Sequence, residues 1–233
     1  MEFGKVESLW RYPVKSLIGE KLKSLDIDAR GVSGDREYAV SNSDGKFGSG
    51  KDTRRFRRVD GLFSMSAKTA GNSVSIKFPD GVVLTDKDSS MNDKLSKTLG
   101  QSVTLTKEGE TSHFDDGAVH ILTTSSLSLL HELLPESGID SRRFRPNIII
   151  NSQHHDQELI GKTIKVGEVI LEISHKTQRC RMITIDQPGL DSRPEILKLV
   201  AQQFGLNFGV YAKVVSTGAV SVGEQVEIVS QSI

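Results

Sequence analysis

Apolar and polar residues alternate at strand spacing through much of the first half of the chain. The alternation is clearest in Leu25–Asp28, while Val6–Trp10 and Arg36–Val40 are further short runs of strand-like composition. Asp44-Gly45 and Asp80-Gly81 lie between such runs and are typical hairpin turns, because glycine adopts a positive φ at no steric cost. The pattern predicts a first half built mainly from short β-strands.

Two helices are predicted in the second half. The first spans Thr123–Leu134, where leucines recur at helical spacing and either Thr124 or Ser125 can cap the N-terminus. Pro135 and Gly138 follow this run and end the helix.

The second helix follows Ser192, which can act as its cap. Pro194 lies in its first turn, and Gly205 ends it. Between these two points, apolar residues lie along one helical face: Ile196, Leu197, Val200 and Phe204.

The remaining apolar runs of the second half predict strands. Ile148–Ile150 is a continuous β-branched run of the kind found in buried strands. Lys162–Val166 and Val169–Ser174 predict a hairpin, and Gly209–Val215 and Val226–Val229 predict short strands towards the end.

Composition and charge narrow the class of protein. The 233 residues suffice for one large domain or two packed ones. Thirty Lys and Arg balance thirty Asp and Glu, so the net charge is zero and no overall field attracts nucleic acid or an anionic membrane. No apolar run has the length of a signal peptide core or a membrane span, so we expect a cytoplasmic protein.

Cys180 is the only cysteine, which excludes an intramolecular disulfide and a thiolate-bound iron–sulfur cluster. Arg179 and Arg181 flank it and would favour the thiolate, which is both a nucleophile and a soft metal ligand. In an extended strand these arginines point away from the cysteine, so they help only if the chain turns here. An inert buried cysteine is the alternative.

Two arginine-rich segments could bind anions. Ser141–Asn147 carries three arginines directly before an apolar strand, where they could converge on a pocket or remain a solvated loop. Lys51–Arg58 carries five basic residues in eight, which is compatible with a small nucleic-acid patch or with a phosphate or carboxylate site.

Two further features are weaker candidates for a metal site or a catalytic site. His154-His155-Asp156 could contribute to a metal site, but neighbouring histidines in a strand point to opposite faces and the segment is polar. Ser16, Ser33 and Ser125 lack a Gly-x-Ser-x-Gly setting, so nothing supports a serine hydrolase.

Four motifs in series resemble the ordered motif set of MOSC proteins. They are Tyr12–Ser16, Gly31–Arg36, Arg143–Ile148 and Arg179–Asp186. The family comprises the C-terminal domain of molybdenum cofactor sulfurases and the amidoxime-reducing enzymes. The resemblance implies a mainly β fold with a few helices (α+β): a distorted MOSC β-barrel in residues 116–233, preceded by a small N-terminal β domain in residues 1–115.

The same resemblance implies a molybdenum pterin cofactor. Cys180 matches the cysteine that ligates molybdenum in the amidoxime-reducing branch. A thiolate can complete the sulfur ligands of molybdenum, and Arg, Lys and helix N-termini suit the terminal phosphate of the pterin. The resemblance implies cofactor contacts from Lys15, Ser16, Arg36, Thr124, Ser125, Arg145 and Asn147.

The implied activity is the reduction of small N-hydroxylated compounds. No ferredoxin-like cysteine set is present, so electrons would come from a separate protein, and neither nucleic acid nor a membrane is expected as a partner. Two alternatives keep the fold: a sulfur-transfer protein with a Cys180 persulfide, and a non-enzymatic carrier of the cofactor. The basic residues in Thr53–Phe63 depart from the family pattern and leave the substrate open.

Overall fold

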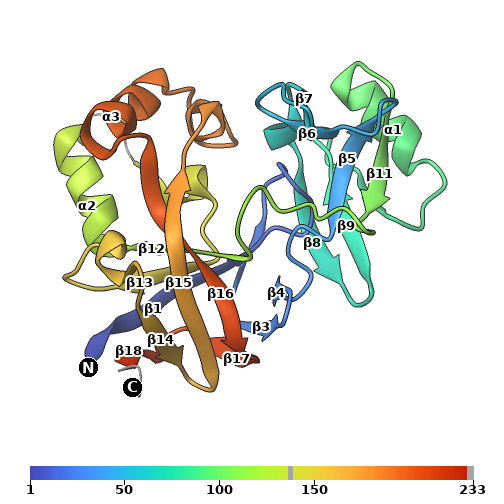
Figure 1. Cartoon of the computed structure of the whole chain (residues 1–233). Helices are drawn as coiled ribbons and strands as arrows, with labels where there is room; N and C mark the ends of the chain where they lie inside the picture. The colour runs from blue at the N-terminus through green and yellow to red at the C-terminus, as the bar shows by residue number, and fades with distance from the viewer. Residues whose placement is uncertain (136–138, 230–233) are drawn as a thin grey trace.

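The computed structural model describes residues 1–135 and 139–229, which form two lobes side by side (Figure 1). Seven strands of one lobe close into a β-barrel in the order β13, β12, β16, β15, β14, β18 and β1, and β1 pairs again with β13. β2 extends the sheet beyond β1. These strands are β1 (Glu2–Arg11), β2 (Glu20–Leu22), β12 (Val119–Thr123), β13 (Ile148–Asn151), β14 (Thr163–Val166), β15 (Val169–Gln178), β16 (Asn207–Ser216) and β18 (Gln225–Val229).

The barrel is closed by its most apolar strand. Ile148–Ile150 of β13 is buried, runs parallel to β12 and antiparallel to β1, and confirms the predicted buried strand. The predicted β14–β15 hairpin is also confirmed. A small sheet adds further apolar residues to the barrel core from β3 (Ser24–Asp28), β4 (Gly31–Val32) and β17 (Gly218–Ser221).

Both predicted helices are confirmed, but their N-caps differ from the prediction. α2 (Thr124–Leu133) is capped by Thr123, whose side chain accepts a hydrogen bond from the backbone N–H of Ser126. α3 (Pro194–Phe204) follows Arg193, while the Ser192 hydroxyl donates to the carbonyl of Thr184. Gly205 ends α3 at φ 58°, as predicted, and Gly138 lies outside the described residues. Short 3₁₀ helices are η3 (Ser141–Phe144), η4 (Asp156–Leu159) and η5 (Arg181–Thr184).

The second lobe is a small β domain around its own core. Its four-stranded sheet runs β11-β5-β6-β7, and β10-β9-β8 forms a separate three-stranded sheet. Both predicted hairpin turns are confirmed, with Gly45 and Gly81 at positive φ. The elements are β5 (Tyr38–Asn42), β6 (Phe47–Ser49), β7 (Phe56–Arg58), η1 (Leu62–Ser64), β8 (Ser66–Ala70), β9 (Ser73–Lys77), β10 (Val83–Thr85), α1 (Met91–Leu99) and β11 (Val103–Lys107).

Two features of this lobe differ from the sequence pattern. α1 was not predicted, because it buries only Met91 and Leu95 in a largely polar stretch. The strand predicted from Arg36 begins instead at Tyr38, because Arg36 occupies a left-handed turn at φ 52°.

The small lobe interrupts the barrel lobe along the chain. β1 to β4 belong to the barrel lobe, since β1 pairs with β13 and β18 and β3 pairs with β17. The small lobe is therefore an excursion from β5 to β11 between two parts of the barrel. Within the described ranges, no helix is both long and apolar enough to span a membrane.

Candidate functional site

A cavity of about 80 Å³ lies between the lobes and gathers most of the predicted site residues. Cys180 and Met182 line one part of it, and Ser16 and Tyr211 line others. Its basic lining is Lys15, Arg36, Lys51, Arg143, Arg145 and Arg179, against Asp115 as the acidic lining residue.

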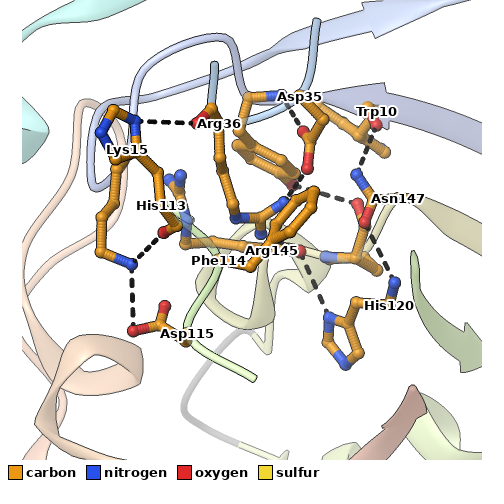
Figure 2. Close-up of polar contacts among 12 residues, drawn as sticks. Trp10, Lys15, Asp35, Arg36, His113, Phe114, Asp115, His120, Arg145 and Asn147 are labelled. Atoms are coloured by element: carbon orange, nitrogen blue, oxygen red, sulfur yellow. Dashed lines mark hydrogen bonds and ion pairs between the residues drawn. The ribbon is translucent and has the colours of Figure 1, made fainter. Parts of the chain in front are cut away.

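Lys15 is buried in this cavity, with 2% of its side chain exposed. Its ammonium donates to the carbonyl of His113 at 2.8 Å and forms an ion pair with Asp115 at 3.1 Å (Figure 2). Burial lowers the pKa of Lys15 to about 8, although the Asp115 carboxylate partly restores it. Ser16 beside it donates to the carbonyl of Gly48 at 3.0 Å, which ties the two lobes together.

Arg36 and Asp35 form the buried ion pair of the site. Asp35 is completely buried and accepts a hydrogen bond from the backbone N–H of Tyr12 at 2.7 Å. It pairs with the Arg36 guanidinium, which also donates to the carbonyl of Arg145 at 3.4 Å (Figure 2). This pair fixes Arg36 at the cavity wall and orients the chain that carries Arg145.

Arg145 forms no ion pair with any carboxylate in residues 1–135 and 139–229. Its guanidinium donates to the carbonyl of Leu17 and lies 4.2 Å from the ring centre of Tyr12, while its Nη2 is buried without a hydrogen-bond partner. Burial, and then the like charge of Arg36, lower the pKa of Arg145 to about 10. The site therefore contains a buried guanidinium that forms no direct ion pair within the described chain, although the Asp35 and Asp115 charges act on it from further away.

Asn147 supports the site from behind the cavity lining. It is fully buried; its side-chain oxygen accepts from the backbone N–H of His120 at 3.0 Å, and its amide donates to the carbonyl of Trp10 at 3.3 Å. His120 in turn lies 3.3 Å from the carbonyl of Arg145 through its Nδ1 (Figure 2). Asn147 thus positions the strands around Arg145, and it does not itself line the cavity.

The chain turns at Cys180, which resolves the roles of its two arginine neighbours. β15 ends at Gln178, and Cys180 precedes η5. Arg179 lines the cavity and donates to the carbonyl of Phe144 at 2.7 Å, whereas Arg181 is exposed and lies 3.7 Å from Asp60. Of these two arginines, only Arg179 therefore contributes positive charge to the cavity beside the half-buried thiol.

Left-handed backbone is concentrated at this site. Four non-glycine residues of the described ranges have positive φ, and three of them are Ser16, Arg36 and Arg145. Such conformations cost about 1–3 kcal/mol each and persist where surrounding structure imposes them. The fourth, Leu206, accepts the backbone N–H of Arg179 at 2.7 Å, so it also holds a residue of the cavity.

Thr124 and Ser125 do not line the cavity. Thr124 donates to the side chain of Asn151 and to the carbonyl of Ser152, each at 3.4 Å. The Ser125 hydroxyl lies 3.3 Å from Nδ1 of His155. The structure therefore does not bring these two predicted contacts together with the four that line the cavity: Lys15, Ser16, Arg36 and Arg145.

The histidine and arginine clusters of the sequence are also divided in space. His154 pairs with Glu158, whereas His155 contacts Ser125, and no group of three or more metal-ligating side chains occurs in the described ranges. Arg142 is held by Asp140 outside the cavity, while Arg143 and Arg145 line it.

Sequence reasoning missed Asp115, because no local pattern marks a partner 100 positions from Lys15.

The donor set fits an anionic group. Arg143 Nε, Arg145 Nη2 and Arg179 Nε are all buried without a hydrogen-bond partner, and all three arginines line the cavity. Buried cations are stable only when paired, and guanidiniums bind phosphate well. The cavity volume of about 80 Å³ admits a group of about phosphate size. It is smaller than the ~300–1,000 Å³ of typical ligand sites. A larger ligand therefore requires rim side chains such as Lys51 and Met182 to move.

Comparison with known families agrees with this geometry. The model of the MOSC domain matches residues 100–227, and that of the MOSC N-terminal beta barrel domain matches residues 3–118. The chain belongs to the MOSC family. The predicted family and the predicted β-barrel fold are both confirmed.

Individual relatives cover this MOSC chain to different extents. The molybdenum cofactor sulfurase of Drosophila melanogaster is 25% identical over 236 residues, which cover 86% of this chain and 30% of that protein. That of Drosophila pseudoobscura pseudoobscura is 36% identical over 94 residues, covering 39% and 12%. The chain thus spans less than a third of these relatives.

A solved structure shares the fold over nearly its whole length. The YUAD protein from Bacillus subtilis superposes with a TM-score of 0.54 at 16% identity, covering 97% of this chain and 94% of that one. At this identity the similarity shows the fold alone.

Proposed function

We propose that this MOSC protein binds a molybdenum pterin cofactor in the inter-lobe cavity, with Cys180 as the molybdenum ligand, and reduces small N-hydroxylated compounds. The observation that carries the proposal is that three arginines, each with an unpaired buried nitrogen, line the same cavity as the only cysteine: Arg143, Arg145 and Arg179. A thiolate beside a cationic cradle suits a cofactor that joins a metal to a phosphate.

Different residues of the cavity and its surroundings would have different roles in binding the cofactor. Lys15, Arg36 and Arg145 would hold the anionic part of the cofactor, since their charges already converge on the cavity. Arg179 would attract a Cys180 thiolate, and Asn147 would keep Arg145 in place through His120. Thr124 and Ser125 are left out of this set, because their hydroxyl groups contact residues outside the cavity.

The cofactor would supply two-electron redox chemistry when bound. The overall reaction breaks the N–O bond: the substrate takes two electrons and two protons, and gives the N–H compound and water. The electrons come from a separate donor protein in the cytoplasm, on this proposal.

Turnover with an artificial donor tests the reaction itself. The protein, expressed in a host that makes the cofactor, should reduce benzamidoxime to benzamidine with reduced methyl viologen. Cys180→Ser should lose this activity, whereas Arg58→Gln, at an exposed arginine that does not line the cavity, should retain it. A cofactor-loaded protein without turnover would contradict the reductase and leave a cofactor carrier.

The curated relatives favour a second candidate, sulfur transfer through a Cys180 persulfide. They are named molybdenum cofactor sulfurases, and a half-buried thiol beside Arg179 would suit a negatively charged persulfide. Intact-mass spectrometry separates the two candidates: one extra sulfur atom, lost in Cys180→Ser, supports transfer, and its absence together with bound molybdenum supports the reductase.

A further inference from the structure

A basic strap, Lys51–Arg58, follows β6 and includes β7. Gly50, directly before it, lies close to the barrel lobe. A Cβ at Gly50 would lie 2.6 Å from the sulfur of Met182 and 3.2 Å from Ile185. The small lobe thus places the start of the strap beside the barrel residues that follow Cys180.

Phe56 links the basic strap to the cavity. The ammonium of Lys15 lies 4.7 Å from the centre of its ring, and Lys51 and Arg55 lie at 5.2 Å and 5.3 Å. Lys51 also lines the cavity, and Arg55 donates to the carbonyl of Ser112 at 2.6 Å. The strap therefore forms the outer continuation of the cavity wall.

The outer side of the strap carries excess positive charge. Arg57 lies 3.5 Å from Asp44 and 3.6 Å from Asp52, and Arg58 and Arg181 share Asp60. Arg54 is exposed and makes no hydrogen bond or ion pair with any residue of the described ranges. Lys51 lines the cavity, as Asp115 does, but the outer side still has five cations against three carboxylates, in a chain whose total charge is zero: Arg54, Arg55, Arg57, Arg58 and Arg181 against Asp44, Asp52 and Asp60.

We propose that the basic strap and Arg181 form the docking surface for a small acidic one-electron carrier protein that reduces the Cys180 site. This inference rests on the proposed function, because the reduction needs electrons and the one cysteine of these 233 residues cannot hold an iron–sulfur cluster. Two donor molecules would each give up one electron for every N–OH group reduced. Transient redox interfaces are small, and charge complementarity speeds their formation and makes it salt-dependent.

A plant-type [2Fe–2S] ferredoxin is the probe, because it is an acidic one-electron carrier. Its affinity is measured by calorimetry at low and high salt, on the chain with or without bound molybdenum. The test variants are Arg54→Glu, which breaks no contact within the described chain, and Arg54→Glu with Arg57→Glu. The control is Lys23→Glu, an exposed lysine next to β3, which Figure 1 places at the opposite end of the molecule from β7.

The double variant should bind ferredoxin about tenfold more weakly at low salt, and Arg54→Glu about threefold more weakly. High salt should bring the wild type down to the level of the double variant, since screening acts on exposed charges. Molybdenum content, thermal midpoint and turnover with methyl viologen should stay unchanged, while ferredoxin-driven turnover falls.

Unchanged ferredoxin affinity in the double variant, or an equal loss in Lys23→Glu, would overturn the docking surface. The docking surface would also be overturned if the double variant lost as much viologen-driven turnover as ferredoxin-driven turnover. The same holds if a duplex oligonucleotide bound these arginines more tightly than ferredoxin does. A chain that binds ferredoxin through the strap but holds no molybdenum would retain the docking surface and contradict the proposed function instead.

Discussion

The cavity and the basic strap are both rich in cations, but the protein treats these cations in different ways. In the cavity, Lys15 and Arg145 are almost fully buried, and Arg145 forms no ion pair with a carboxylate of the described residues. On the strap, the Arg57 and Arg58 side chains are 46% and 47% exposed and lie beside aspartates. Water stabilises the strap charges whatever they contact, whereas the cavity charges depend on partners. Access to water therefore distinguishes the buried anion site from the exposed charged surface.

The largest effect should come from removing Asp35, the buried acid that holds Arg36 at the cavity wall. Asp35→Asn leaves Arg36 without its carboxylate in a completely buried position, and breaking such a pair costs about 3–5 kcal/mol. Urea unfolding should show this loss. The matched variant Asp60→Asn, at an acid shared by two exposed arginines, should lose less than about 1 kcal/mol. If the two variants lost the same free energy of unfolding, the buried and exposed ion pairs would not differ as described.

A smaller effect concerns the pH dependence of anion binding in the cavity. Burial lowers the pKa of Lys15 to about 8, so its ammonium is charged below that pH and neutral above it. Sulfate, whose charge is constant here, should bind fully below pH 8 and more weakly as the pH rises above it. Lys15→Met should bind about tenfold more weakly at pH 7 and lose this dependence.

Calorimetric titrations with sulfate at pH 6.5, 7.5 and 9 measure both quantities. Lys23→Glu serves as the control for a change of charge elsewhere. An affinity that stays constant or rises through pH 8 would show that Lys15 does not bind the anion.

The smallest effect is expected on the strap. Arg58→Ala removes one exposed ion pair with Asp60, so the free energy of unfolding should change by less than about 1 kcal/mol. The change should disappear in high salt, because exposed pairs are screened. A loss above about 2 kcal/mol that persists in salt would mean that the strap is a structural element.

Most of the fold could be predicted from the sequence, because local signals decide its elements. Pro194 and Gly205 bound α3, and Gly45 and Gly81 mark hairpins. The arrangement of the lobes could not be predicted, because β1 reaches β13 only through pairings such as Lys5 with Asn151. α1 was missed since its apolar face is narrow.

The site could be predicted only in part. The motif resemblance found Lys15, Arg36, Arg145 and Cys180, which the structure gathers in one cavity. It could not find Asp115, whose role depends on contact with Lys15 across the fold. Nor could strand periodicity show the left-handed backbone at Arg36 and Arg145, because tertiary packing imposes it.

Metal analysis of the wild type beside Cys180→Ala tests the central claim most directly, with both proteins expressed where the pterin cofactor is made. Cys180 is half-buried, so its substitution should leave the fold intact, which circular dichroism checks. We predict near-stoichiometric molybdenum in the wild type and little or none in Cys180→Ala. No molybdenum in either protein, or equal amounts in both, would contradict Cys180 as the ligand that anchors the cofactor.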